Sequence, residues 1–460
     1  MGKKVELWIL LLVIWFGLIF TIVFSWSLKS ELIGWKRAGI LGRIAYNTSN
    51  IPTLIYDIFQ YKKTPEYHPL ILKNIWPEIN GFSKYGKISP NVYNDMGYLL
   101  LSAYSESKKQ STVKLIRIND QHIIHEWVPD IDAIRKIHKK IDVNELPRDF
   151  NFTYLTKNRF RIFHPLLLND GSLIFHHSAK SFLIKISKCS DIIWTANNQH
   201  HHSLEQDIQE NIWTPTRIYP SVYDTINEIY RDDAIAQINQ NGEVIYEKSV
   251  TEILIENGYQ ALLWGVGQDA FEWDPIHLND IQPTLSSSKF WEVGDLFISI
   301  KNKSTVFLYR PQTNKILWLK TGPWLNQHDV NILNQSQISV FNNNVISTSS
   351  DAKKNGNNNV YIFDFEKSAV LFPYDSILKE LDVMTWTEGR SKILENGDVF
   401  VEETNNGRLL RVSADTTKWE FTATIDSNYV GLMSWSRYLT YNEIKDVLPI
   451  LENSECQKQK

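Results

Sequence analysis

The hydrophobic and polar positions of this chain follow two different patterns. Residues 7–26 (LWILLLVIWFGLIFTIVFSW) contain no charged side chain, and a helix of that length spans roughly 30 Å, the thickness of the hydrocarbon core of a bilayer. From about residue 86, short apolar runs alternate with Asn, Asp and Gly, a texture typical of all-β structure. The pattern therefore predicts a transmembrane anchor over residues 1–28 and a β domain over residues 86–440.

The segments outside these two regions are less regular. Residues 29–85 mix helical signals with four prolines, which predicts a short, partly helical juxtamembrane connector, and residues 441–460 read as a polar tail. A buried core helix and a cleaved signal peptide are alternative interpretations of the apolar run, although no small-residue cleavage site follows it closely. Lysines flank the run on both sides, so the positive-inside rule does not fix its orientation.

A repeated unit organises the β domain. Six copies of a β-rich run, a polar turn and a second run begin at Val113, Phe182, Ala234, Thr305, Val360 and Leu409. A second strand–turn–strand unit precedes the later copies, beginning at His164, His202, His277, His328 and Arg390. Two hairpins make a four-stranded sheet, and radial stacking lets such sheets bury both faces. We therefore predict an all-β fold, a six-bladed β-propeller, with a pair of irregular β-sandwiches as the alternative.

Composition and charge narrow the classes of function. The 460 residues include 16 Trp, 20 Tyr and 21 Phe against 4 Met, a bias toward β structure. The net charge of −4 provides no basic surface for a nucleic-acid partner. Cys189 and Cys456 are the only cysteines, which excludes a disulfide framework and a cysteine-based zinc site. One disulfide could form, but the polar tail around Cys456 favours two free thiols.

Three histidines begin three consecutive predicted blades. His202 and His328 occupy the same register of the repeat, and His277 begins the same unit in a blade that an insertion stretches. A lone histidine at a strand start is usually a surface or capping residue, but three equivalent ones should converge on the channel axis. Converging imidazoles suit a metal site, acid–base chemistry or nucleophilic catalysis. Lys301 on the next strand disfavours a divalent cation and favours an anion such as sulfate or phosphate.

Several segments, in order, resemble the arylsulfotransferase family, the PAPS-independent arylsulfate sulfotransferases. They are HHSLEQDIQENIWTP, IHLNDIQP, GDLFISIKNKSTVFLY, KILWLKTG and GPWLNQHDVNIL, within residues 160–440. The family fold is a six-bladed propeller, in agreement with the repeats. The resemblance implies transfer of a sulfuryl group from a small aryl sulfate to a phenol through a sulfohistidine, with no nucleotide cofactor and no metal ion. It also favours a periplasmic or extracellular place for the globular domain.

The resemblance assigns roles to residues of this chain. His328, in Gln-His-Asp, is the implied nucleophile. His202, His277 and Asn279 would hold the sulfuryl oxygens and protonate the departing phenolate. The family's cation on the strand after the second histidine is normally Arg, and Lys301 matches that position here.

Two alternative functions and one further candidate residue remain open. Lys301 supplies charge without the planar fork of Arg, which is compatible with a non-catalytic propeller that binds a ligand or a protein partner at the channel mouth. A metal-dependent hydrolase that uses the three histidines is a further hypothesis. Arg390 begins another blade one residue out of the histidine register and is an additional candidate for binding the substrate anion.

Overall fold

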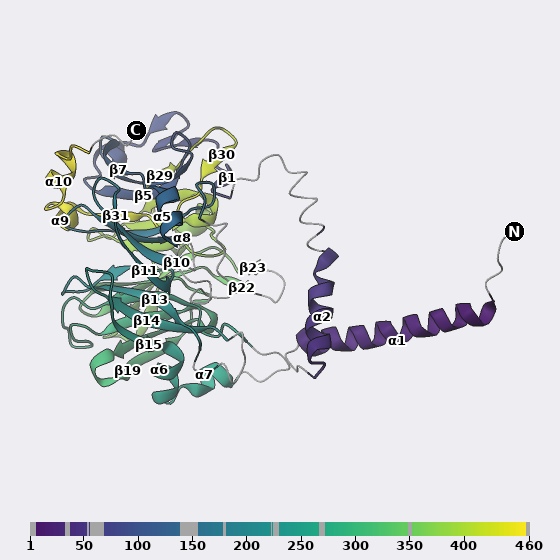
Figure 1. Ribbon diagram of the computed structural model, residues 1–460. Coiled ribbons are helices and arrows are strands. Elements are labelled where there is room, and N and C mark those ends of the chain that lie inside the picture. The colour runs from purple at the N-terminus through teal and green to yellow at the C-terminus, as the bar shows by residue number, and fades with distance from the viewer. Residues whose placement is uncertain are drawn as a thin grey trace. The chain divides into compact units, whose positions relative to one another are not determined.

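The structure, a computed structural model, describes residues 6–32, 37–52, 55, 69–138, 155–177, 181–221, 223, 230–265, 272–347 and 352–456. These residues belong to two compact units, each of which is described by itself (Figure 1). One unit comprises residues 1–67 and 264–273, and the other comprises residues 68–263 and 274–460.

The first unit contains a long apolar helix. Helix α1 (Leu7–Leu32) has a mean hydropathy of 2.8 over its most apolar 18-residue window and is followed by α2 (Ile40–Ser49), which packs against it. By length and composition α1 is able to cross a membrane, although a signal sequence has the same properties. The predicted apolar helix is therefore confirmed, and its role as an anchor stays a prediction. Part of the predicted connector, at residues 33–36, 53–54 and 56–68, lies outside the described residues.

The second unit is a β-propeller of antiparallel sheets. The first blade has the order β31 (Arg437–Leu439), β5 (Tyr98–Ser105), β6 (Gln110–Arg117) and β7 (His122–Trp127). An eight-stranded sheet supplies the next two, built from β8 (Ile162–Leu167), β9 (Leu173–His177), β10 (Ser181–Ile186) and β11 (Ile192–His200), then β12 (Glu205–Gln206), β13 (Ile212–Ile218), β14 (Asp232–Ile238) and β15 (Val244–Ser249). Strand β5 is buried along its whole length because sheets cover both of its faces.

Three further four-stranded sheets complete this series. They are β16 (Leu278–Pro283), β17 (Leu296–Ile300), β18 (Thr305–Arg310) and β19 (Lys315–Thr321); β20 (Asp329–Asn334), β21 (Gln337–Asn342), β24 (Asn359–Asp364) and β25 (Ala369–Leu371); and β26 (Arg390–Ile393), β27 (Val399–Glu403), β28 (Arg408–Val412) and β29 (Thr417–Thr422). The C-terminal strand β31 pairs with β5, so residues far apart in the sequence close one blade. In Figure 1 the yellow end of the chain accordingly lies beside the blue strand β5.

The predicted fold class of six blades behind a partly helical connector is corrected by a further sheet. Strands β2 (Ile79–Asn80), β3 (Ser83–Lys84) and β4 (Lys87–Ile88) form a three-stranded sheet that contacts β29. Phe82 in this sheet packs against the rings of Trp419 and Phe421. Together with the six four-stranded groups it gives seven blade-like sheets. The prediction missed it because strands of two residues are too short to show an alternating pattern.

Short helices, 3₁₀ turns and two-stranded sheets connect or flank the blade strands. Two-stranded sheets pair β1 (Ile71–Lys73) with β30 (Tyr429–Gly431) and β22 (Val345–Ser347) with β23 (Ala352–Lys354). The helices are α4 (Pro90–Tyr93), α5 (Ile131–His138), α6 (Val250–Glu256), α7 (Gln260–Trp264), α8 (Asp375–Glu380), α9 (Tyr441–Ile444) and α10 (Leu448–Glu452), with 3₁₀ turns η3 (Lys301–Lys303), η4 (Pro311–Thr313) and η5 (Thr404–Asn406). Helix α6 begins after Ser249, whose side chain accepts a hydrogen bond from the Glu252 N–H.

The two cysteines form a disulfide, which corrects the preference for free thiols. Cys189 lies in the turn between β10 and β11 and Cys456 follows α10, with their Cα atoms 5.3 Å apart. The polar segment around Cys456 is held against the propeller, because α10 packs on β7 and Ser454 contacts His125 at 3.2 Å. Because disulfides persist in oxidising compartments, the bond and the apolar helix together suggest a secreted or otherwise extracytoplasmic protein.

Candidate active site

The structure brings the three sequence-predicted histidines together. The ring centroid of His202 lies 5.5 Å from that of His277 and 6.2 Å from that of His328. His277 and His328 immediately precede the inner strands β16 and β20, and His202 precedes β12. Asn279, on β16, is buried and donates a hydrogen bond of 3.1 Å to the Gln327 carbonyl, one residue before His328. Sequence positions more than a hundred residues apart thus converge on one small cluster.

Both ring nitrogens of His328 have protein partners. Nδ1 lies 2.7 Å from Oδ1 of Asn343, and Nε2 accepts a hydrogen bond of 3.0 Å from the backbone N–H of Glu388. The Asn343 amide nitrogen donates to the carbonyls of Thr385 and Glu388, so its oxygen faces the ring and receives the Nδ1 proton. Burial lowers the pKa of His328 well below its ordinary value, and the charge of Lys301 adds to this. The ring is therefore a neutral imidazole with its basic lone pair on Nε2.

His202 is linked to a second imidazole rather than to a carboxylate. Its Nδ1 lies 2.7 Å from Nδ1 of His201, whose Nε2 is 3.6 Å from Oδ1 of Asp233. Arg217 holds that carboxylate through a 3.0 Å ion pair. Burial lowers the pKa of His202 well below its ordinary value, and the neighbouring His201 adds to the effect. His202 is accordingly a second neutral ring in the cluster.

His277 pairs with a carboxylate. Its Nδ1 lies 2.8 Å from Oδ2 of Asp274, and Arg231 contacts the same oxygen at 3.1 Å. The His277 side chain is 24% exposed, whereas His202 and His328 are buried. This ring is the most accessible of the three imidazoles.

Lys301 supplies a positive charge beside the cluster. It begins η3 directly after β17, and its backbone N–H donates to the His277 carbonyl at 3.1 Å. Burial lowers the pKa of the Lys301 ammonium, while Asp274 opposes the shift. Within the described part of the chain, no ion pair or hydrogen bond engages its Nζ. The charge is thus available to an anion held by the imidazoles.

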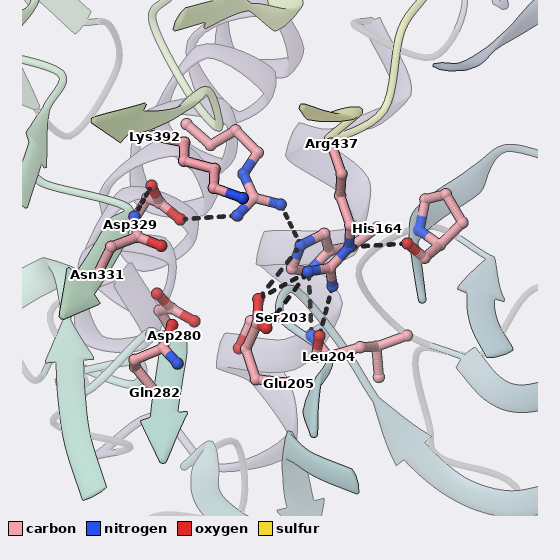
Figure 2. A network of polar contacts seen from close by, with 12 residues as sticks. His164, Ser203, Leu204, Glu205, Asp280, Gln282, Asp329, Asn331, Lys392 and Arg437 are labelled. Carbon is pink, nitrogen blue, oxygen red and sulfur yellow. Dashed lines mark hydrogen bonds and ion pairs between the residues drawn. The ribbon is translucent and has the colours of Figure 1, made fainter. Parts of the chain in front are cut away.

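Arg390 lies in a neighbouring charged network and not among the three imidazoles. Its guanidinium contacts Nε2 of His164 and lies 3.6 Å from Oδ1 of Asp329. Figure 2 shows this network, in which inner strands contribute Glu205, Asp280 and Asp329 opposite Arg437 and Lys392. A cavity of about 350 Å³ opens here, lined on its polar side by residues such as Gln282, Asn331, Arg390, Lys392 and Arg437. Asp280 and Asp329 accept backbone hydrogen bonds from Val330 and Ser391, which ties neighbouring inner strands together.

Sequence reasoning missed the partners of the histidines. Asp274 has a local signal, a carboxylate three residues before His277. Asn343 and the Glu388 backbone have none, because their contacts with His328 join different strands or blades. Trp435, one of the 16 tryptophans, has no distinguishing sequence signal, and its ring lies 6.3 Å from His202 and 6.5 Å from His328.

The arrangement suits transfer of an anionic group. A neutral, buried imidazole offers a lone pair, a second imidazole carries a carboxylate partner, and an ammonium and an amide lie beside them. Among the described residues, no group of three or more His, Cys, Asp and Glu side chains is placed to hold a metal ion.

Comparisons with known proteins bear on this site. The sequence model of a family described as Arylsulfotransferase (ASST) matches residues 164–424, more than half of the chain. No curated protein matches the chain.

Several solved structures have limited similarity to this chain. They include a protein of unknown function from Bacteroides caccae (11% identity, 75% of this chain and 99% of that chain covered, TM-score 0.44). A streptogramin B lyase is 9% identical, with 79% of this chain and 91% of that chain covered and a TM-score of 0.39. The periplasmic gluconolactonase of Pseudomonas aeruginosa is 11% identical, with 75% of this chain and 99% of that chain covered and a TM-score of 0.39.

Proposed function

The chain belongs to the arylsulfotransferase (ASST) family, and from that premise we propose that it is a PAPS-independent aryl sulfotransferase. It would move a sulfuryl group from a small aryl sulfate to a phenol. The observation that carries the proposal is the convergence of His202, His277 and His328 beside Lys301, within the segment that the family model matches.

The reaction we propose has two half-reactions. The Nε2 lone pair of His328 forms a bond to the sulfur of the aryl sulfate, and the bond from sulfur to the phenolic oxygen breaks. The departing oxygen receives a proton from a neighbouring imidazole and leaves as a phenol. In the second half, the oxygen of an acceptor phenol bonds to sulfur, the N–S bond breaks, and the acceptor's proton returns to that imidazole.

The contacts of His328 support this role and define one requirement. Asn343 holds the Nδ1 proton at 2.7 Å, which leaves Nε2 as the nucleophilic nitrogen. The Glu388 N–H occupies that lone pair at 3.0 Å, so the hydrogen bond must be released when the sulfate enters. Lys301, His202 and Asn279 would then bind the sulfuryl oxygens, where removal of one such donor costs about 10²–10³ in rate.

The placement of the protein follows from the same premise. We propose that α1 is a single-pass anchor and that the propeller lies outside the cytoplasm, in the periplasm or the extracellular space. The disulfide between Cys189 and Cys456 supports an oxidising compartment.

A non-catalytic, ligand-binding propeller is the second candidate. The observation that favours it is the occupied Nε2 of His328, combined with a lysine at the position where the resemblance leads us to expect arginine. A protein of this kind would bind aryl sulfates or a partner at the channel mouth without turning them over.

Turnover of 4-nitrophenyl sulfate in the presence of phenol separates the two candidates. We expect the full-length, detergent-solubilised protein to release nitrophenol in a phenol-dependent, ping-pong reaction, and His328→Ala to abolish it. His122→Ala, at an exposed position on the outer strand β7, is the control and should retain the wild-type rate. Release that survives in His328→Ala would remove His328 from the mechanism, and no release by the wild type would favour the binding protein.

A further inference from the structure

Only one of the three clustered imidazoles pairs directly with a carboxylate. Nδ1 of His277 lies 2.8 Å from Oδ2 of Asp274, whereas Nδ1 of His328 faces an amide and Nδ1 of His202 faces the ring of His201. A carboxylate stabilises an imidazolium, while an amide or a second neutral imidazole does so far less. The three rings are therefore not equivalent as carriers of a proton.

Two contacts besides the one with His277 fix Asp274 in place. Arg231 holds its Oδ2 at 3.1 Å and Asn302 donates to its backbone carbonyl at 2.6 Å, and the residue is 6% exposed. Burial would raise the pKa of Asp274, but the hydrogen bond to His277 and the charges of His277 and Arg231 outweigh it and hold the pKa below its usual range. The carboxylate therefore stays ionised in the folded protein.

The environment of the other two rings opposes protonation. His202 and His328 are 6% and 2% exposed, and burial keeps both rings neutral. The Nε2 atom of His328 also accepts the Glu388 N–H, which a protonated nitrogen cannot do. With Nδ1 bound to Asp274, a proton added to His277 resides on Nε2, the nitrogen opposite the dyad and on the more accessible ring.

We propose that Asp274 is a positioning residue that makes His277 the proton carrier of the reaction, an inference that rests on the proposed sulfuryl transfer. In the first half-reaction the His277 imidazolium gives its Nε2 proton to the departing phenolic oxygen as the S–O bond breaks. In the second half, neutral His277 takes the proton of the acceptor phenol as its oxygen bonds to sulfur. Asp274 retains the Nδ1 proton throughout and stays a carboxylate.

The test compares leaving groups in Asp274→Asn. Asparagine can still accept the Nδ1 hydrogen bond but does not stabilise the imidazolium, so kcat should fall most for donors whose phenol leaves poorly. We expect a loss of about 10²–10³ with phenyl sulfate, in the range of general acid catalysis, and less than about tenfold with 4-nitrophenyl sulfate. KM should change little, because the substitution leaves the groups that bind the sulfuryl oxygens in place.

Asp295→Asn is the matched control. Asp295 is a buried carboxylate on the rim of the same blade, held by Arg310 at 2.7 Å, and it lacks contact with the three histidines. It should lose thermal stability in a similar way without any dependence of the rate on the leaving group. A second readout does not require turnover. The Nδ1–H of His277 in ¹⁵N-histidine NMR should be protected from exchange in wild type and in Asp295→Asn, and less protected in Asp274→Asn, because a neutral amide oxygen is a weaker acceptor than a carboxylate.

The outcomes distinguish a failure of the role assigned to Asp274 from a failure of the proposed sulfotransferase activity. If the wild type turns over aryl sulfates but Asp274→Asn slows every donor equally, Asp274 is structural only and the inference is wrong. An Nδ1–H signal that is identical in both variants and wild type would overturn it as well. If the wild type turns over no aryl sulfate at all, the proposed function fails first and the inference fails with it.

Discussion

Replacing Lys301 with methionine should lower the activity and raise the stability of the folded protein. The Lys301 side chain ends in an ammonium that no carboxylate among the described residues pairs with, and burial lowers its pKa. A half-buried charge without a direct ionic partner costs folding energy, whereas the sulfuryl group of a substrate would give that charge a partner. Methionine keeps the length of the side chain and removes the charge.

The expected sizes follow from the electrostatics of the site. Two unit charges about 4 Å apart at an effective dielectric constant of about 20 interact by about 4 kcal/mol, and a sulfuryl oxygen carries only part of a charge. Loss of one such donor costs about 3–4 kcal/mol in measured cases, which corresponds to a rate loss of about 10²–10³. Removal of this half-buried charge should raise the free energy of unfolding by about 0.5–2 kcal/mol.

The assay measures kcat/KM for 4-nitrophenyl sulfate beside urea unfolding at pH 7.5. Lys301→Arg is the matched control: it should retain activity, because it keeps the charge, and its activity should persist to higher pH, because arginine holds its proton where the lowered pKa of Lys301 no longer does. A Lys301→Met protein with wild-type kcat/KM would refute the assigned role. A Lys301→Met protein that is both inactive and less stable would show that the side chain serves packing instead.

Three further predictions concern stability. Reduction of the bond between Cys189 and Cys456, which closes a span of 267 residues, should lower the free energy of unfolding by about 2–5 kcal/mol; a melting temperature unchanged by reductant would contradict the bond. Burial lowers the pKa of His138 to about 4 from an ordinary 6.5. The unfolded chain therefore binds a proton that the folded chain refuses, and stability should fall by up to roughly 3 kcal/mol between about pH 6.5 and pH 4. His138→Leu should flatten that dependence in urea titrations, and an unchanged slope would argue against it. Gly389→Ala should destabilise by about 1–3 kcal/mol, because φ is +81° and a Cβ would lie 2.5 Å from Thr385; calorimetry showing no loss would contradict the strained turn.

The sequence revealed the parts of the fold that repeat in register. Hairpins that begin at Phe182, Ala234, Thr305 and Leu409 recur with enough alternation to be recognised as blades, and the strands β10, β14, β18 and β28 lie there. The three-stranded sheet over residues 79–88 was missed because its strands are too short to carry a pattern. The disulfide was missed because only the fold brings the C-terminal tail to the turn that holds Cys189.

The candidate site divides in the same way. His202, His277 and His328 were recognisable because each lies just before a strand of its blade, and radial stacking converts that shared register into proximity. The side chains that set their protonation were not, since Asn343 and the Glu388 backbone reach His328 from other strands. Arg390 shows the limit of register alone, because its ion pair with Asp329 turns it toward the charged network.

Direct detection of the covalent intermediate tests the account's central claim. The full-length protein is mixed with excess 4-nitrophenyl sulfate in the absence of any phenol acceptor, quenched in alkali and digested, and the peptide that contains His328 is examined by mass spectrometry. The account predicts one added SO₃ group on His328, formed with a stoichiometric burst of nitrophenol and discharged when phenol is added. An adduct on another residue, or turnover with phenol in the absence of any adduct, would contradict it.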